Sequence, residues 1–84
     1  MNEKIMVVDD DKDIREVIQV LLSSEGYTVV EASNGKEALE LVDDDTDLII
    51  LDVMMPEMNG YQACVLLREK TKAPILFLTA KGQD

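Results

Sequence analysis

The chain alternates apolar runs of strand length with longer segments in which apolar residues recur at helical spacing. The strand-like runs are residues 5–8, 27–30, 48–51 and 75–78. Three of them are continuous apolar stretches, which is typical of strands that are buried on both faces. Strands that alternate with helices form a parallel sheet with helices on both sides. The sequence therefore predicts a single α/β domain with the element order β-α-β-α-β-α-β.

Three helices are predicted between these strands from apolar spacing and from signals at their ends. One aspartate of the 9–11 run caps the first helix, and Gly26 marks its C-terminal end. Asn34 caps the second helix, and the third follows a loop over residues 53–59 and ends near Lys70. The apolar positions of the three helices are Ile14, Val17, Ile18, Leu21 and Leu22, then Ala38, Leu39, Leu41 and Val42, then Ala63, Leu66 and Leu67.

Charge and composition exclude several classes of function. The formal net charge is −10, there is no histidine, and Cys64 is the single cysteine. We expect no nucleic-acid or membrane binding by this segment, because contacts with phosphates need clustered lysine and arginine. The residues present can form neither a zinc site nor an internal disulfide. The N-terminal apolar run is too short for a signal peptide or a membrane span, so a cytoplasmic location is expected.

Polar side chains follow three of the predicted strands. Asp9 and Asp10 follow the first strand, Asp52 the third and Thr79 the fourth. Because the carboxyl ends of parallel strands lie at one edge of a sheet, these side chains converge if the first and third strands are neighbours. Two carboxylates about 4 Å apart repel by roughly 4 kcal/mol at an effective dielectric constant of about 20. Either one pKa rises or a cation binds between them.

An all-oxygen site of this kind favours Mg²⁺ or Mn²⁺. A carboxylate beside such an ion can attack a phosphoryl group, and the metal neutralises the charge that develops during transfer. The sequence therefore indicates Mg²⁺-dependent phosphoryl transfer onto an aspartate. Asp52 is the strongest candidate, since it lies within an apolar run where an unpaired charge is costly. A lone aspartate after a strand more often caps the next helix, so Asp9 or Asp11 alone indicates little.

Other acidic and sulfur-containing residues are assigned structural roles. The 43–45 run is as acidic as the 9–11 run, but it follows a helix and is interpreted as a solvated turn. Met54, Met55 and Met58 are interpreted as packing residues of a loop. Cys64 is interpreted as a small buried hydrophobic residue. None of these residues is predicted to bind a metal through its side chain.

Three segments together resemble the receiver domains of response regulators in bacterial two-component systems. They are IMVVDD at residues 5–10, LIILDVMMPEMNG at 48–60 and ILFLTAK at 75–81. Each is a weak signal alone, but their order and spacing are highly specific. The resemblance covers essentially the whole chain. It implies a flavodoxin-like, doubly wound parallel sheet with strand order 2-1-3-4-5, of which this chain would contain 2-1-3-4.

The resemblance also implies a role for each residue at the acidic edge. Asp52 would accept a phosphoryl group from a sensor histidine kinase. Asp10 would ligate Mg²⁺ directly, Asp9 would hold one of its water ligands, and the backbone carbonyl of Met54 would supply a further ligand. Thr79 would be the hydroxyl that moves to meet the phosphoryl group. Such a receiver assists its own phosphorylation and dephosphorylation but is not a conventional enzyme.

The family pattern continues past the last residue of this sequence with a helix, a strand and a helix. The resemblance therefore implies a partial receiver domain over residues 1–84, without the family's lysine at the end of the fifth strand. Lys81 lies only two residues after Thr79 and does not replace that lysine. Pro56 and Gly60 would shape the loop before the third helix. With the fourth strand as an exposed edge, we expect self-association through that strand or by exchange of elements between copies.

Two other functions remain open at this point. One is a structural or self-associating fragment without phosphorylation activity, which the missing lysine favours. The other is an enzyme of the haloacid-dehalogenase type, which also uses an aspartate nucleophile and Mg²⁺. That family needs a second carboxylate two residues after the nucleophile, where this chain has Met54. Nucleotide binding through a glycine-rich loop is excluded, because neither GxxxxGK[ST] nor GxGxxG occurs.

Overall fold

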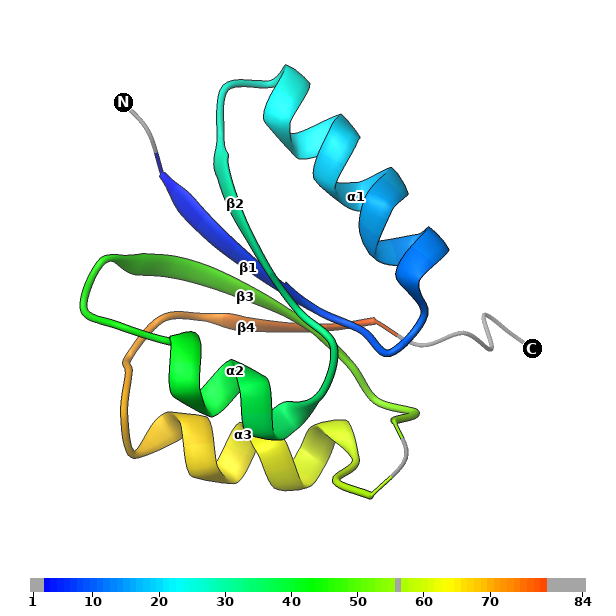
Figure 1. The fold of residues 1–84 in the computed structure, drawn as a ribbon. Coiled ribbons are helices and arrows are strands. Elements are labelled where there is room, and N and C mark those ends of the chain that lie inside the picture. Colours follow the sequence, from blue (N-terminus) through cyan, green and yellow to red (C-terminus); the bar gives the residue numbers. More distant parts are fainter. Residues whose placement is uncertain (1–2, 56, 79–84) are drawn as a thin grey trace.

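A computed structural model describes residues 3–55 and 57–78 of the chain. Strands and helices alternate along these residues (Figure 1). The elements are β1 (Lys4–Val8), α1 (Lys12–Ser24), β2 (Thr28–Ala32), α2 (Gly35–Leu41), β3 (Thr46–Asp52), α3 (Gly60–Arg68) and β4 (Ile75–Leu78). The predicted order of elements is confirmed, although β2 and β3 extend beyond the apolar runs that predicted them.

The four strands form one parallel sheet in the order β2-β1-β3-β4. The predicted strand order is therefore confirmed. The chain adds β2 on one side of β1 and then adds β3 and β4 on the other side, so the winding reverses between β1 and β3. Val8 at the end of β1 pairs with Leu51 near the end of β3. The carboxyl ends of these two strands are thus neighbours, which is the condition on which the predicted acidic site depends.

Helix α1 covers one face of the sheet, and α2 and α3 cover the other (Figure 1). The main core lies between the sheet and α2 and α3. Its fully buried members are Met6, Val8, Ile49, Leu51, Ala38, Ala63 and Leu67. Ile5 and Val7, the β1 side chains of the other face, are also buried, as expected for a strand covered on both sides. None of the helices among the described residues is long and apolar enough to span a membrane.

The inward face of α1 is rotated from the predicted apolar face. The partly buried residues of this helix are Arg15, Ile18, Gln19 and Leu22. Val17 and Leu21, two of the apolar positions that predicted this helix, are 59% and 61% exposed. Apolar spacing identifies a stripe on a helix but not which part of a wide stripe faces the sheet. Together with Val20, these two residues form an exposed apolar stripe on α1.

Side-chain caps fix where the helices begin. The carboxylate of Asp11 accepts hydrogen bonds of 2.9 and 3.4 Å from amides in the first turn of α1. Asn34 accepts a 2.7 Å hydrogen bond from the first turn of α2. Both caps were predicted. Asn59 caps α3 and forms a reciprocal capping box with Gln62, which was not predicted. Gly26 ends the α1 turn with a φ of 96°, a conformation that favours glycine.

The structural roles assigned to other residues are partly confirmed. Residues 43–45 are all exposed, as expected for a solvated turn. Met55 is buried and Met58 packs against the core, but Met54 is 66% exposed, so its predicted packing role was wrong. Cys64 is half-buried against the core. Met54 instead lies beside the aspartates at the carboxyl edge of the sheet.

Candidate functional site

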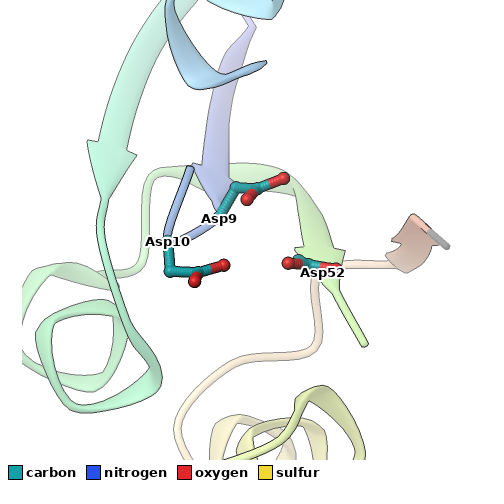
Figure 2. Close-up of side chains that lie close together, drawn as sticks. All are labelled: Asp9, Asp10 and Asp52. Atoms are coloured by element: carbon teal, nitrogen blue, oxygen red, sulfur yellow. The ribbon is translucent and has the colours of Figure 1, made fainter. Parts of the chain in front are cut away.

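Three aspartates meet at the carboxyl edge of the sheet. Asp9 and Asp10 directly follow β1, and Asp52 is the last residue of β3. One carboxylate oxygen from each residue lies within 4.8 Å of the other two. Figure 2 shows the carboxylates of Asp10 and Asp52 directed toward one another, with Asp9 beside them. The structure therefore brings together the three carboxylates that the strand ends predicted.

Backbone amides hold two of these carboxylates in place. Asp9 is 3% exposed, and its Oδ1 accepts a 2.9 Å hydrogen bond from the amide of Asp11. Asp52 is 7% exposed, and its Oδ1 accepts a 3.0 Å hydrogen bond from the amide of Met54. Asp10, in contrast, is exposed to solvent. The site thus has a buried, fixed pair and a third carboxylate on the solvent side.

Burial and mutual repulsion shift the pKa values at this site upward. Burial is the largest cause that raises the pKa of Asp52 from its ordinary value of 3.8 to about 6. The charges of Asp9 and Asp10 contribute to this rise, and the hydrogen bond from the Met54 amide opposes it. Burial also raises the pKa of Asp9, and the neighbouring acidic charges add to this shift. Among the described residues, no lysine or arginine contributes to either shift.

The donors at this site suit a hard divalent cation. The aspartates line a cavity of about 230 Å³ together with Asp11, Ile14, Met54 and Leu78. Carboxylate oxygens without nitrogen or sulfur ligands are the set that Mg²⁺ and Mn²⁺ prefer. A divalent cation between the carboxylates would also offset their mutual repulsion. Met54, which is predicted to offer a backbone carbonyl, lies in the wall of the same cavity.

Thr79, the predicted switch hydroxyl, lies outside the described residues, as do Pro56 and Lys81. The residue before Thr79, Leu78, is the last residue of β4 and lines the acidic cavity. The fourth strand therefore ends beside the aspartates, as the sequence predicted. The role of Thr79 stays a prediction.

The start of α3 packs directly on the end of β3. The amide of Gly60 donates a 3.0 Å hydrogen bond to the carbonyl of Val53. A Cβ atom on Gly60 would lie 2.8 Å from the Cα of Val53 and would also meet the carbonyl oxygen of Asp52. Only glycine permits this approach. This close contact explains why position 60, at the end of the loop that follows Asp52, needs a glycine.

Arg15 is a neighbour of the site that the sequence did not single out. Its Nη1 donates a 2.7 Å hydrogen bond to the backbone carbonyl of Asp9, and its Nε lies 3.2 Å from Oε1 of Glu31 on β2. Arg15 follows the capping Asp11 by one helical turn, on the inward face of α1. Because apolar spacing does not show which positions of α1 face the sheet, no local sequence signal identified Arg15.

Comparison with known proteins identifies relatives over nearly the whole chain. Residues 5–84 match the family model of the response regulator receiver domain. The chain is 47% identical over 82 residues to the uncharacterized transcriptional regulatory protein YrkP of Bacillus subtilis, a match that covers 98% of this chain and 36% of YrkP. The chain thus spans about a third of the length of the curated relatives that it matches.

Two solved structures match both the sequence and the fold. The response regulator protein TrrA of Thermotoga maritima in complex with Mg(2+)-BeF is 42% identical, with a TM-score of 0.86 over 98% of this chain and 72% of that chain. The complex of histidine kinase ThkA with TrrA matches at 40% identity, with a TM-score of 0.85 over 99% of this chain and 72% of that chain. The residues that match the family model include all three aspartates. The chain belongs to the family of response regulator receiver domains.

Proposed function

We propose that this chain is the phosphoacceptor module of a two-component response regulator, and that Asp52 accepts a phosphoryl group from a sensor histidine kinase in the cytoplasm. The convergence of Asp9, Asp10 and Asp52 at the ends of β1 and β3 is the observation that carries this proposal. The complex of ThkA with TrrA supports a histidine kinase as the partner, and the Mg(2+)-BeF complex of TrrA supports Mg²⁺ as the cation. Membership of the receiver family argues against the haloacid-dehalogenase alternative.

The geometry around Asp52 suits nucleophilic attack on phosphorus. The Met54 amide binds Oδ1 of Asp52, so Oδ2 is available to form the new O–P bond while the bond from phosphorus to the donor breaks. With a pKa of about 6, the carboxylate is largely ionised at neutral pH yet more basic than an ordinary aspartate.

The other residues of the acidic edge would hold the metal and signal that Asp52 is phosphorylated. Asp10 would bind Mg²⁺ directly, Asp9 through a water molecule, and Met54 through its backbone carbonyl. When bound, Mg²⁺ would neutralise charge on the transferring group. Thr79 would supply the switch hydroxyl. In this role the chain is a phosphoacceptor that assists its own phosphorylation and dephosphorylation and is not a conventional enzyme.

Incubation with acetyl phosphate and Mg²⁺, followed by intact mass measurement, tests the proposal. The wild-type chain is expected to gain one phosphoryl group, and chelation of Mg²⁺ should prevent this gain. Asp52→Asn preserves shape and the Met54 hydrogen bond but removes the nucleophile, so it should gain no mass. If folded wild-type protein with bound Mg²⁺ gains no mass, the phosphoacceptor proposal is wrong for the 84-residue chain, and the structural alternative for a partial receiver domain is favoured.

We also propose that the 84-residue chain self-associates through β4, with a second copy as the partner. Among the described residues β4 is an outer strand of the sheet, and Leu76 and Phe77 on it are 58% and 37% exposed. An apolar edge strand is a template for pairing with another chain. The alternative arrangement is an exchange of elements between copies.

Light scattering during size-exclusion chromatography tests this association. We expect a dimer or larger species, and more of it at higher salt, because the net charge of −10 opposes association and salt screens that repulsion. Leu76→Lys should shift the chain toward monomer, whereas Leu41→Lys, at an exposed apolar position on α2, should not. A wild-type chain that stays monomeric at all concentrations and salt levels would contradict self-association.

A further inference from the structure

We propose that Arg15 is a positioning residue, which holds the peptide between Asp9 and Asp10 in the orientation that lets their carboxylates bind a divalent cation. The inference rests on the proposed Mg²⁺ site and adds a residue that itself contacts neither metal nor phosphoryl group. It predicts that a change on α1, outside the acidic cluster, controls the affinity of the cluster for Mg²⁺.

The guanidinium of Arg15 bridges the ends of two strands. Its Nη1 donates a 2.7 Å hydrogen bond to the Asp9 carbonyl, just beyond β1, and its Nε pairs at 3.2 Å with Glu31 on β2. The Arg15 side chain is only 15% exposed, whereas the Glu31 side chain is 40% exposed, so the arginine is the shielded member of the pair. A planar guanidinium offers several donors in fixed directions, which a lysine ammonium does not. The side chain therefore connects α1, β1 and β2 at one point.

The Asp9 carbonyl belongs to the peptide group that links the two aspartates. On the other side of Asp9, its amide donates a 3.1 Å hydrogen bond to the carbonyl of Ala32. Its carboxylate is held by the Asp11 amide at 2.9 Å. Arg15 adds the contact on the Asp10 side. Rotation of this peptide would move the Asp10 carboxylate away from Asp52, and Arg15 opposes that rotation.

The sign of the expected effect separates positioning from simple electrostatics. Arg15→Met would make the net charge one unit more negative than −10, which by long-range attraction should strengthen binding of Mg²⁺. A loss of positioning acts in the opposite direction. Residues that orient metal ligands typically change metal affinity by about tenfold or more when replaced. We therefore expect Arg15→Met to bind Mg²⁺ about tenfold more weakly than wild type.

Lys4 provides a matched control away from the acidic site. Lys4 begins β1, and its Nζ lies 2.7 Å from the Asp43 carboxylate, at the far end of the strand from the acidic site. Lys4→Met therefore removes the same charge and also breaks an ion pair that links two segments. Isothermal titration calorimetry with Mg²⁺ should show weaker binding for Arg15→Met and no weakening for Lys4→Met. Unchanged or tighter binding by folded Arg15→Met, or equal weakening in both variants, would overturn the inference.

Hydrogen exchange in the metal-free chain gives a readout that does not depend on Mg²⁺. Arg15→Met should increase exchange of the Asp11 amide, which binds the Asp9 carboxylate, and Lys4→Met should not. If the wild-type chain binds no Mg²⁺, the proposed function fails. Hydrogen exchange of the Asp11 amide then decides by itself whether Arg15 orders the segment of residues 9–11. If Arg15→Met does not fold, Arg15→Lys takes its place. An ammonium lacks the planar set of donors that reaches the Asp9 carbonyl and Glu31 together, so wild-type Mg²⁺ affinity and exchange in Arg15→Lys would equally overturn the inference.

Discussion

Gly60→Ala is expected to destabilise the chain by about 3 kcal/mol or more and to disrupt the acidic site with it. The new Cβ would lie 2.8 Å from the Cα of Val53 and would meet the carbonyl oxygen of Asp52. Both are backbone atoms at the end of β3, so no side-chain rotation can relieve the clash. Either α3 must move away from the sheet or the segment that carries Asp52 must shift.

Gly35→Ala is a matched control for this substitution. Gly35 and Gly60 are each the first residue of a helix and each follows an asparagine cap. A Cβ on Gly35 would lie 2.6 Å from the sulfur of Met58, which is the far end of a flexible side chain, and 3.2 Å from the Cβ of Ala63. We expect a cost of about 1 kcal/mol or less, because Met58 can change rotamer. Urea unfolding followed by circular dichroism measures both variants, and equal losses of stability would contradict this account.

The features predicted correctly depend on local pattern and on general rules of parallel sheets. Continuous apolar runs identified β1, β3 and β4, and the aspartates that follow β1 and β3 were expected to meet if those strands were neighbours. The strand order itself came from the resemblance of three segments to a known family, because apolar pattern does not specify which strands pair. The site followed from strand order and strand ends together.

The features that were missed depend on tertiary contacts. The exposed positions of Val17 and Leu21 follow from how α1 rotates against the sheet, which apolar spacing along a wide stripe does not determine. The bridge from Arg15 to Asp9 joins residues on different elements, and the tight contact of Gly60 depends on where α3 crosses the end of β3. The Asn59 cap was the exception, since asparagine three residues before Gln62 is a local signal that was overlooked.

Without a divalent cation, the chain is expected to lose stability as the pH rises through about 6. The pKa of Asp52 is about 6 in the folded state and near its ordinary value of 3.8 when unfolded. The folded state therefore binds the proton more tightly, and ionisation of Asp52 disfavours folding. The contribution of Asp52 to the free energy of unfolding is most favourable below about pH 4 and falls by roughly 2–3 kcal/mol by about pH 7. The raised pKa of Asp9 acts in the same direction.

Asp52→Asn should remove most of this pH dependence, so at pH 7 the metal-free variant should be more stable than wild type. Asp43→Asn is the control with opposite sign, because Lys4 lowers the pKa of Asp43 and its ionised form stabilises the fold. That variant should be less stable than wild type at pH 7. Urea unfolding in chelator over about three pH units around the expected pKa, from roughly pH 4.5 to 7.5, measures all three proteins. If Asp52→Asn and wild type lose stability in parallel as the pH rises, the acidic cluster does not carry the uncompensated charge that a bound cation would neutralise.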